Sequence, residues 1–521
     1  MKSLITCCAM AGIAEWACCP GELNGPLLHA LADCPLIHRW SQADERCAAY
    51  FALGRIQATG RPVAVLAGTG AEATSLMPAV VEAYYQRRPL LVITLDTCAH
   101  AGGTGALHRI EHENLFGIYA PTIEMQLPCG VSDLPDLRAA LAEGFPLHLN
   151  VRVEPQSLAE ALPEAFVNFE VAEPPPSAPF RASLVALSQM LRFRSVEGLV
   201  LLFGGLEPTE QEPALWLART LRVPVLAEAA SGLREELAAY ALHGGERLLS
   251  QCPPRYVLRV GDVPTGSFWK ALENMPEVEV FSLTRTGFSG LCRKSHVIEG
   301  DLEQIMKALG DVPHVGDTQR LLPRSRHHAG RVEELLLAYP ESEAAMVRAF
   351  SNHAGIADVI CLGSGSTMAL WNDYAQSQVP TLYVRANNGA GGADGTVSSF
   401  LGNAADAGYA CCLTGDLSLL RDSGAAAMLP QLPAGRRVVA VLNNEGAGQV
   451  EGAGLDPELK RLMVQPPTFS MAELARLWGA EYYAINCEAD FEELDALEDN
   501  AFALLELRPD PAQTSAFRHS L

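Results

Sequence analysis

Two short segments decide how this chain folds: Cys412-Leu-Thr-Gly415-Asp416-Leu-Ser418 and, further on, Val441-Leu-Asn443-Asn444-Glu445-Gly446. Each begins in an apolar run, residues 409–413 and 437–442, and ends in Gly, Asp or Asn, which is typical of a buried strand that runs into a loop. A helix-like segment, residues 419–429, lies between the two runs. The pattern predicts strand, loop, helix, strand and loop, which is the repeating unit of a parallel sheet covered by helices.

Asp416, Asn444 and Gly446 follow the carboxyl ends of the two predicted strands. In open parallel sheets, ligands bind at that edge. A carboxylate, an amide oxygen and backbone carbonyls form a hard-oxygen set that suits Mg²⁺ or Ca²⁺ and leaves coordination positions for a phosphate. The alternative is that these are two ordinary loops of a doubly wound sheet, because short motifs also match by chance.

Composition and charge narrow the class of protein. The 521 residues are 49% hydrophobic and 19% charged, which suits several packed cores. The net charge of −23 argues against nucleic acid or an anionic membrane as a partner, because both select basic surfaces. No apolar run approaches the ~20 residues of a membrane span, and the first residues lack a signal-peptide cleavage pattern, so a cytoplasmic location is expected. The 14 cysteines form no paired CxxC pattern and are expected to be buried thiols in apolar runs, such as Cys7, Cys8, Cys361, Cys411 and Cys412.

The order of strand-like and helix-like segments predicts an α/β protein of three domains, each a doubly wound parallel sheet. The predicted domains are residues 1–168, 182–312 and 331–513. A proline-rich linker at 170–179 separates the first two, and a polar, basic stretch at 313–330 separates the second from the third. The first and third domains share a pattern of Gly-rich strand ends, and residues 514–521 are interpreted as a loose tail.

The chain resembles the thiamine-diphosphate-dependent decarboxylases and carboligases over nearly its whole length. The family's metal motif, Gly-Asp followed one helix and one strand later by Asn-Asn, is matched by Gly415-Asp416 and Asn443-Asn444. Near the N-terminus, Pro20-Gly21, Asp44-Glu45-Arg46 and Gly68-Thr-Gly70 also look like that family. Within it, the chain is similar to the menaquinone-pathway synthases that join 2-oxoglutarate to isochorismate, through segments such as Asn388-Gly-Ala-Gly-Gly-Ala-Asp394-Gly395.

This resemblance implies thiamine diphosphate and Mg²⁺ as cofactors. It implies a pyrimidine-binding first domain and a third domain that binds the diphosphate and the metal, with Asp416, Asn444 and Gly446 as metal ligands. Further cofactor contacts are expected from the loops that match the family: Pro20, Gly21, Gly68, Thr69, Gly415, Leu417 and Ser418. Either Gln449 or Val450 would prop the bent cofactor, depending on whether residues 447–448 include an insertion.

Glu45 is expected to carry the chemistry. In the family, this glutamate hydrogen-bonds the aminopyrimidine ring of the cofactor. The cofactor attacks a 2-oxo acid, CO₂ is released, and an acyl-anion equivalent passes to an acceptor. Burial would raise the pKa of Glu45, which suits proton sharing. The alternative is that Asp44-Glu45-Arg46 merely caps a helix. His108 and His112 are further candidates for proton transfer, against the alternative that they are structural.

The substrate side departs from the synthases that the chain resembles. Their basic substrate-binding residues are replaced here by uncharged or acidic ones: Glu22-Leu23, Gly102, Ser267-Phe268, Ala369 and Asn388. Because arginine binds carboxylates through paired hydrogen bonds, this loss predicts a pair other than 2-oxoglutarate plus isochorismate, for example pyruvate and a neutral or amine-bearing acceptor. The candidate substrate contacts lie in loops that match the family's substrate side: Glu22, Asn24, Gly365, Ser366 and Asn388.

The expected function is decarboxylation of a 2-oxo acid and transfer of the acyl-anion equivalent to an acceptor. Plain decarboxylation and a non-catalytic, cofactor-binding subunit are alternatives. A nucleotide-binding oxidoreductase is a further one, but neither 363–368 nor 68–73 completes G-x-G-x-x-G. Family active sites form between the first domain of one chain and the third domain of another, so a homodimer or homotetramer is expected.

Overall fold

The structure is a computed structural model that describes residues 1–21, 24–68, 70–96, 103–106, 110–127, 129, 135–153, 170–173, 183–192, 197–377, 379–381, 383–446 and 456–521. The chain divides into two compact units. The first comprises Met1–Ala178, Asn387–Asp406 and Arg421–Pro433, and the second comprises Pro179–Ala386, Ala407–Leu420 and Ala434–Leu521. The first unit contains one sheet and the second contains two.

The first sheet has six parallel strands in the order β2-β1-β3-β4-β6-β5. Trp16 and Ala17, successive residues of β1, enter different apolar clusters, as expected for a strand buried on both faces. Its strands are β1 (Glu15–Cys18), β2 (His38–Ser41), β3 (Val63–Leu66), β4 (Leu90–Asp96), β5 (Thr122–Leu127) and β6 (Leu147–Val153). Its helices are α1 (Lys2–Met10), α2 (Gly25–Ala32), α3 (Glu45–Thr59), α4 (Met77–Gln86) and α5 (Leu137–Leu141), and α15 (Thr396–Asn403) belongs to the same unit.

The central sheet has five parallel strands in the order β11-β10-β9-β7-β8. Its strands are β7 (Leu199–Phe203), β8 (Val225–Ala227), β9 (Tyr256–Val260), β10 (Glu279–Thr284) and β11 (His296–Glu299). The helices are α7 (Val185–Arg192), α8 (Pro208–Leu221), α9 (Gly245–Gln251), α10 (Ser267–Ala271), α11 (Leu302–Leu309) and α12 (Leu321–Ala338). Helix α12 begins inside the stretch 313–330 that the composition marked as a boundary.

The ends of β7 and β9 approach each other closely in the central sheet. The Gly204 amide donates to the Val260 carbonyl over 3.0 Å, and a Cβ added at Gly204 would lie 2.1 Å from the Asp262 carbonyl oxygen. Arg285 lies beside the carboxylates of Glu207 and Asp262 at the same edge. These contacts fix the strand ends at the switch point of the central sheet.

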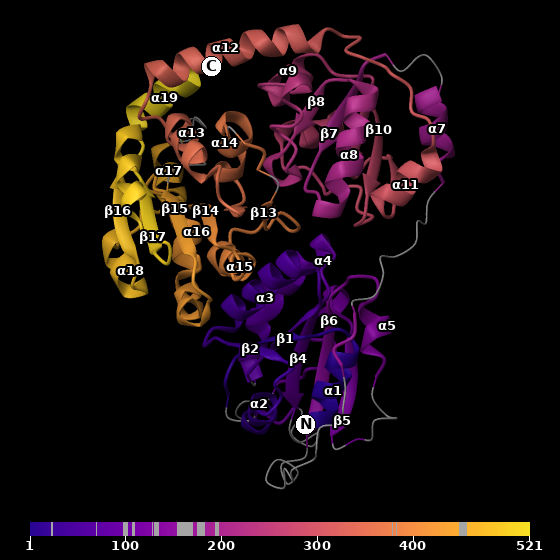
Figure 1. The fold of residues 1–521 in the computed structure, drawn as a ribbon, viewed down its shortest axis with the longest axis vertical. Coiled ribbons are helices and arrows are strands. Elements are labelled where there is room, and N and C mark those ends of the chain that lie inside the picture. The colour runs from indigo at the N-terminus through magenta and orange to yellow at the C-terminus, as the bar shows by residue number, and fades with distance from the viewer. Residues whose placement is uncertain are drawn as a thin grey trace. The chain divides into compact units, whose positions relative to one another are not determined.

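The third sheet repeats the topology of the first, with six parallel strands in the order β13-β12-β14-β15-β17-β16. Its strands are β12 (Val359–Leu362), β13 (Val384–Ala386), β14 (Tyr409–Gly415), β15 (Arg436–Leu442), β16 (Glu481–Ile485) and β17 (Phe502–Leu507). Its helices are α13 (Glu343–Ala354), α14 (Ser366–Tyr374), α16 (Asp416–Arg421), α17 (Pro457–Met463), α18 (Met471–Trp478) and α19 (Pro511–Ser520). Three parallel α/β sheets and the likeness of the first to the third are therefore confirmed (Figure 1).

The C-terminal residues form a docked helix, so their interpretation as a loose tail was wrong. Helix α19 begins at Pro511, with Asp510 accepting a hydrogen bond from the Gln513 amide as its cap. Phe517 is 2% exposed and packs in an apolar cluster with Tyr374 and Leu335. Figure 1 shows α19 beside α12 and α13. One buried aromatic in an otherwise polar segment is too weak a signal to predict this docking.

The segment after Asp416 also differs from the prediction of one helix at 419–429. It forms α16 and then a 3₁₀ helix, Ser423–Gln431. Gly424 and Pro430 lie in the second piece, and both are unfavourable inside an α-helix.

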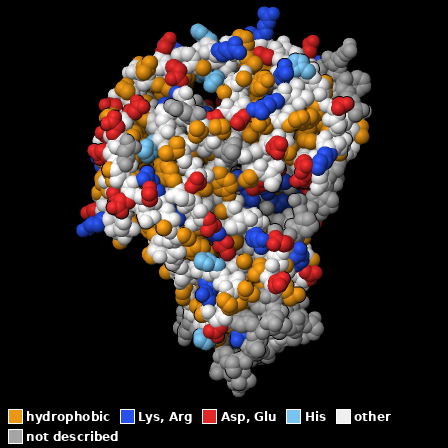
Figure 2. All heavy atoms as spheres, viewed as in Figure 1, with side chains coloured by type: hydrophobic (Ala, Val, Ile, Leu, Met, Phe, Trp, Pro, Cys, Tyr) orange, Lys and Arg blue, Asp and Glu red, His pale blue; other side chains and the backbone are white. Residues whose placement is uncertain are grey.

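The surface and the cysteines agree with the composition. Figure 2 shows acidic side chains spread over the visible face with basic ones among them. Within the part of the chain that the structure describes, no helix is both long and apolar enough to cross a bilayer. The thiols expected inside apolar runs are buried and form no disulfide bond in the described part of the chain: Cys7, Cys8, Cys361, Cys411 and Cys412.

Candidate active site

The predicted pyrimidine loops lie at the switch point of the first sheet, after β1 and β3. Asn24 ties them together, because its Oδ1 accepts from the Gly21 amide over 2.9 Å and its Nδ2 donates to the carbonyls of Cys19 and Ala67. Its side chain is fully buried. Asn24 therefore holds the loops that carry Pro20 and Gly68, and its role as a substrate contact stays a prediction.

Glu45 is the first residue of α3 and lies against the Gly68 loop. Its Oε1 accepts a hydrogen bond from the Gly68 amide over 3.4 Å. The helix is capped by its neighbour Asp44, whose carboxylate accepts from the Cys47 amide over 2.9 Å. The capping role thus belongs to Asp44, and the Glu45 carboxylate faces the loop after β3.

Partial burial raises the pKa of Glu45 above its ordinary value, and the neighbouring carboxylate of Glu72 adds to the rise. Hydrogen bonds from backbone amides, including that of Gly68, act in the opposite direction. The predicted direction is confirmed. Gly68 cannot carry a side chain without moving these groups, because an added Cβ would lie 2.2 Å from Glu72 Oε2 and 3.0 Å from Glu45 Oε1.

The predicted diphosphate and metal loops follow β14 and β15, two neighbouring strands of the third sheet. Asp416 begins α16, is 4% exposed, and accepts from the Gly446 amide at Oδ2 and from the Leu417 amide at Oδ1, each over 2.7 Å. Strands β14 and β15 are neighbours, with Gly415 opposite Leu442, so the fold joins the two loops as predicted. Burial raises the pKa of Asp416, against the effect of these amides. A bound cation would favour the carboxylate form.

The second loop is held by Gly446 and Asn444. Gly446 has a φ of 70°, and an added Cβ would lie 2.3 Å from the Gln465 carbonyl oxygen, so only glycine fits. Asn444 donates from Nδ2 to Glu343 Oε1 over 2.9 Å.

These donors fit the cofactor that the resemblance implies. A carboxylate, an amide and a backbone carbonyl offer the oxygens that Mg²⁺ prefers. A Cβ at Gly415 would meet no atom within 4 Å, which leaves room for a phosphate beside the strand end. Among the described residues, no three His, Cys, Asp or Glu side chains gather as an alternative metal site.

The remaining loop candidates have simple placements. Ser418 is half-buried in α16, and Gly365 (φ 83°) and Ser366 stand at the start of α14.

Asn388 is half-buried in the first unit. Its loop is held by Glu82, which accepts hydrogen bonds from the amides of Gly389 and Ala390 over 2.6 and 2.8 Å. This role of Glu82 could not be predicted, since the partners are 307 and 308 positions away along the chain. Five candidates lie outside the described residues: Glu22, Thr69, His108, Gln449 and Val450.

His112 lies in a buried polar cluster on the first sheet. It is 5% exposed, and its Nδ1 is 3.2 Å from Asn150 Oδ1. Thr94 joins the cluster, with its Oγ1 3.0 Å from Asn150 Oδ1 and 2.8 Å from His148 Nε2. These contacts give His112 a structural setting, and its catalytic role stays a prediction.

His148 makes the first unit sensitive to acid. Burial, with a smaller effect of His112, lowers its pKa from 6.5 to about 3. The unfolded chain therefore binds a proton that the folded unit excludes, so this contribution to stability is complete above pH 6.5 and is lost as the pH falls toward 3. We expect His148→Gln to flatten the fall in unfolding free energy over this range by up to about 1.4 kcal/mol per pH unit. Urea unfolding followed by tryptophan fluorescence at several pH values measures this slope. The exposed His29→Gln is the control, and equal slopes for His148→Gln and the unmodified protein would contradict the prediction.

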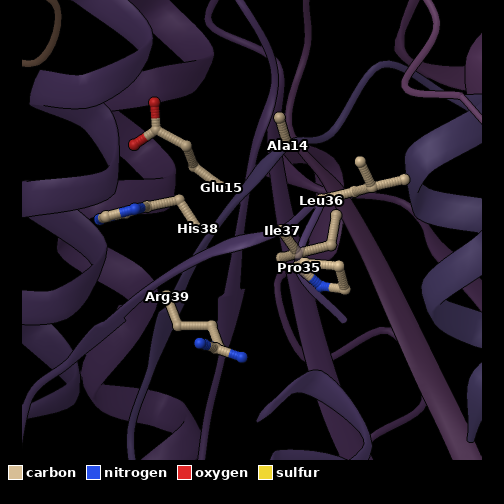
Figure 3. Close-up of a pocket in the computed structure, with 7 residues that line it drawn as sticks. All are labelled: Ala14, Glu15, Pro35, Leu36, Ile37, His38 and Arg39. Carbon is tan, nitrogen blue, oxygen red and sulfur yellow. The ribbon is translucent and has the colours of Figure 1, made fainter. Parts of the chain in front are cut away.

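A surface hollow of about 460 Å³ lies at the other edge of the first sheet. It is lined by residues around the amino ends of β1 and β2: Ala14, Glu15, Pro35, Leu36, Ile37, His38 and Arg39. Figure 3 shows Glu15 and His38 on one side and Leu36 on the other. The Glu15 carboxylate is bound by Arg55 through two contacts of 2.8 Å and by Trp40. The hollow is thus separate from the loops after β1 and β3, and the carboxylate of Glu15 that lines it is held by other side chains of the fold.

Comparison with known proteins supports the same assignment. Residues 1–115 match the model of the thiamine pyrophosphate enzyme N-terminal TPP binding domain. The 2-succinyl-5-enolpyruvyl-6-hydroxy-3-cyclohexene-1-carboxylate synthase of Akkermansia muciniphila is 48% identical, over 99% of this chain and 97% of that protein. Proteins of the same name from Bdellovibrio bacteriovorus and Synechococcus elongatus are 30% and 28% identical, over 90% and 98% of this chain and 89% and 93% of theirs.

Nothing in these comparisons supports the expectation of a substrate pair other than 2-oxoglutarate plus isochorismate, since the relative that is 48% identical carries the synthase name. The similarity extends over nearly the full length of both chains. The chain therefore belongs to the thiamine-diphosphate-dependent enzymes, in the family of the 2-succinyl-5-enolpyruvyl-6-hydroxy-3-cyclohexene-1-carboxylate synthases.

Proposed function

We propose that this protein is itself such a synthase. It decarboxylates 2-oxoglutarate and adds the resulting four-carbon acyl-anion equivalent to isochorismate, with thiamine diphosphate and Mg²⁺ as cofactors. The observation that carries the proposal is the 48% identity to the Akkermansia muciniphila synthase over 99% of the chain. The contacts of Glu45 with the Gly68 loop and of Asp416 with Gly446 support it, because they join the residues that the chemistry needs.

The chain's own groups have distinct tasks in this proposal. Thiamine diphosphate, when bound, supplies the carbanion chemistry. Glu45 holds a proton at its carboxylate against the aminopyrimidine ring, and its raised pKa suits that exchange. Asp416, Asn444 and the Gly446 carbonyl hold the metal that binds the diphosphate. Gly365, Ser366 and Asn388, in the loops at 363–366 and 387–395, remain candidates for substrate contact among the described residues.

Release of CO₂ from a panel of 2-oxo acids tests the donor. Purified protein with thiamine diphosphate and Mg²⁺ is offered 2-oxoglutarate, pyruvate and other 2-oxo acids, each with and without isochorismate. We expect release from 2-oxoglutarate, increased by isochorismate, and release that is slower by about 10²–10⁴-fold from the Glu45→Gln variant. Preference for pyruvate would overturn 2-oxoglutarate as the proposed donor and would support the substrate change inferred from the missing basic residues.

We further propose that the active enzyme is at least a homodimer in which each site combines the first domain of one chain with the third domain of another. This makes complementation between inactive variants possible. Glu45→Gln inactivates the first-domain half of a site, and Asp416→Asn inactivates the third-domain half. In mixed dimers, one of the two sites combines intact halves.

Co-expression of the two inactive variants is therefore expected to restore about one quarter of the activity, since random assembly makes half of the dimers mixed. The purified mixed species, isolated with two different affinity tags, is assayed for CO₂ release. Restoration is expected only in the mixed species. Its absence from a mixed dimer of confirmed composition would contradict a site shared between chains.

A further inference from the structure

The amide of Asn444 is oriented by a charged pair that reaches it from the C-terminal helix. Asn444 Nδ2 donates to Glu343 Oε1 over 2.9 Å, and Arg518 donates from Nη2 to the other oxygen, Glu343 Oε2. Glu343 is 4% exposed, whereas the Arg518 side chain is 37% exposed. All three residues belong to the second unit, and Arg518 lies on α19.

Further contacts fix α19 against the start of α13, where Glu343 stands. The Glu343 amide donates to Thr514 Oγ1 over 3.1 Å, and the Glu341 amide donates to Gln513 Oε1 over 3.0 Å. Phe517 anchors the same helix in the apolar cluster with Tyr374. The guanidinium of Arg518 is therefore presented to Glu343 by a docked helix.

The chemistry of a carboxylate makes this contact selective. An ionised carboxylate only accepts hydrogen bonds, so it binds the nitrogen end of the Asn444 amide. The oxygen end is then turned away from Glu343. Metal ligands in proteins are commonly oriented by partners of this kind, and loss of the partner typically weakens metal binding by about 10–100-fold.

An equivalent arrangement holds the adjacent residue Asn443, which is not a predicted metal ligand. Asn443 Nδ2 donates to Glu506 Oε1 over 2.6 Å, and Arg508 donates from Nη2 to Glu506 Oε2 over 2.7 Å. The two adjacent asparagines thus each have a glutamate and an arginine behind them. Only the pair behind Asn444 bears on a predicted ligand.

We propose that Glu343 and Arg518 are positioning residues for the metal centre, and that the C-terminal helix is thereby part of the cofactor-binding apparatus. The inference rests on the metal role proposed for Asn444. In the unmodified protein, Glu343 selects the oxygen of Asn444 for the metal, and Arg518 offsets the charge of the buried carboxylate. The effect is on metal affinity, with the substrate sites unchanged.

Binding of Mn²⁺ in the presence of thiamine diphosphate tests this inference. The signal of free Mn²⁺ in electron paramagnetic resonance gives the dissociation constant without any assay of activity. We expect Glu343→Gln to weaken Mn²⁺ binding by about 10–100-fold, because its amide can also donate and so permits the flipped Asn444. Arg518→Ala is expected to weaken it by about tenfold, and Arg518→Lys to recover most of the loss by restoring the charge.

Arg508→Ala is the matched control, since it breaks the same kind of pair beside Asn443. It is expected to change the Mn²⁺ dissociation constant less than twofold. An equal loss in Arg508→Ala and Arg518→Ala would overturn the inference, because it would mean that any loosening of the loop has this effect. Unchanged binding in Glu343→Gln and Arg518→Ala would overturn it directly. If the unmodified protein bound no Mn²⁺ with thiamine diphosphate, the proposed function would fail instead.

Discussion

Replacement of Glu45 by Gln is expected to lower the rate of CO₂ release from 2-oxoglutarate by about 10²–10⁴-fold, the range that a positioned acid–base group contributes. Gln has nearly the same shape, and its amide oxygen can still accept from the Gly68 amide, the contact that Glu45 makes over 3.4 Å. It cannot exchange a proton with the cofactor. The loss is therefore expected in turnover, while the temperature of unfolding and the affinity for thiamine diphosphate change little.

Glu72→Gln is the control for charge at this site. Glu72 is exposed, and its carboxylate contributes to the raised pKa of Glu45. Removing its charge lowers the pKa of Glu45, so the part of the pH–rate profile that follows Glu45 is expected to move to lower pH with a rate close to that of the unmodified enzyme. A Glu45→Gln variant with near-normal turnover would contradict the catalytic role of Glu45.

Asp416→Asn is expected to weaken Mg²⁺ binding by at least about 100-fold, since the metal loses the charged oxygen of its proposed set. The substitution keeps one oxygen that can accept from the Gly446 amide, a bond of 2.7 Å in this structure. Thiamine diphosphate binding, followed by quenching of tryptophan fluorescence, should then require far more Mg²⁺.

Asp499→Asn is the control for this experiment. Asp499 lies in the loop before β17, its side chain is fully exposed, and it pairs at 3.4 Å with Arg436 at the amino end of β15. Its replacement removes one charge without touching the two loops, and no change in Mg²⁺ dependence is expected. Equal Mg²⁺ dependence of Asp416→Asn and the unmodified protein would contradict Asp416 as a ligand.

The strands and their loops could be predicted because their signals are local. Val438 to Leu442 form a continuous apolar run that ends in Asn-Asn, and the structure buries each of these residues in β15. The likeness of the first and third sheets followed from Gly-rich strand ends, and their strand orders are the same. The raised pKa of Glu45 followed from its place between an apolar helix and strand.

The partners that hold the site could not be predicted, because they are distant in the sequence. Glu343 precedes Asn444 by 101 positions, and Arg518 lies 175 positions beyond Glu343. Neither has a motif around it, and α19 shows one deeply buried aromatic, Phe517. The hydrogen bonds of Asn24 could not be predicted for a related reason: a loop amide looks the same in sequence whether it faces a substrate or the backbone of the next loop.

The substrate pair was the weakest prediction, since it was inferred from missing arginines rather than from residues present. A basic group can reach a substrate from another position in the fold, so absence at matched positions does not fix the substrate. The relative that is 48% identical outweighs that argument.

The most direct test of the proposed function is the mass and the carbon-13 spectrum of the product formed from 2-oxoglutarate and isochorismate with thiamine diphosphate and Mg²⁺. We predict a product equal to the two substrates less one CO₂, with a new carbon–carbon bond from the former C2 of 2-oxoglutarate to the isochorismate ring. Recovery of unreacted isochorismate, while the same enzyme decarboxylates a different 2-oxo acid, would contradict it.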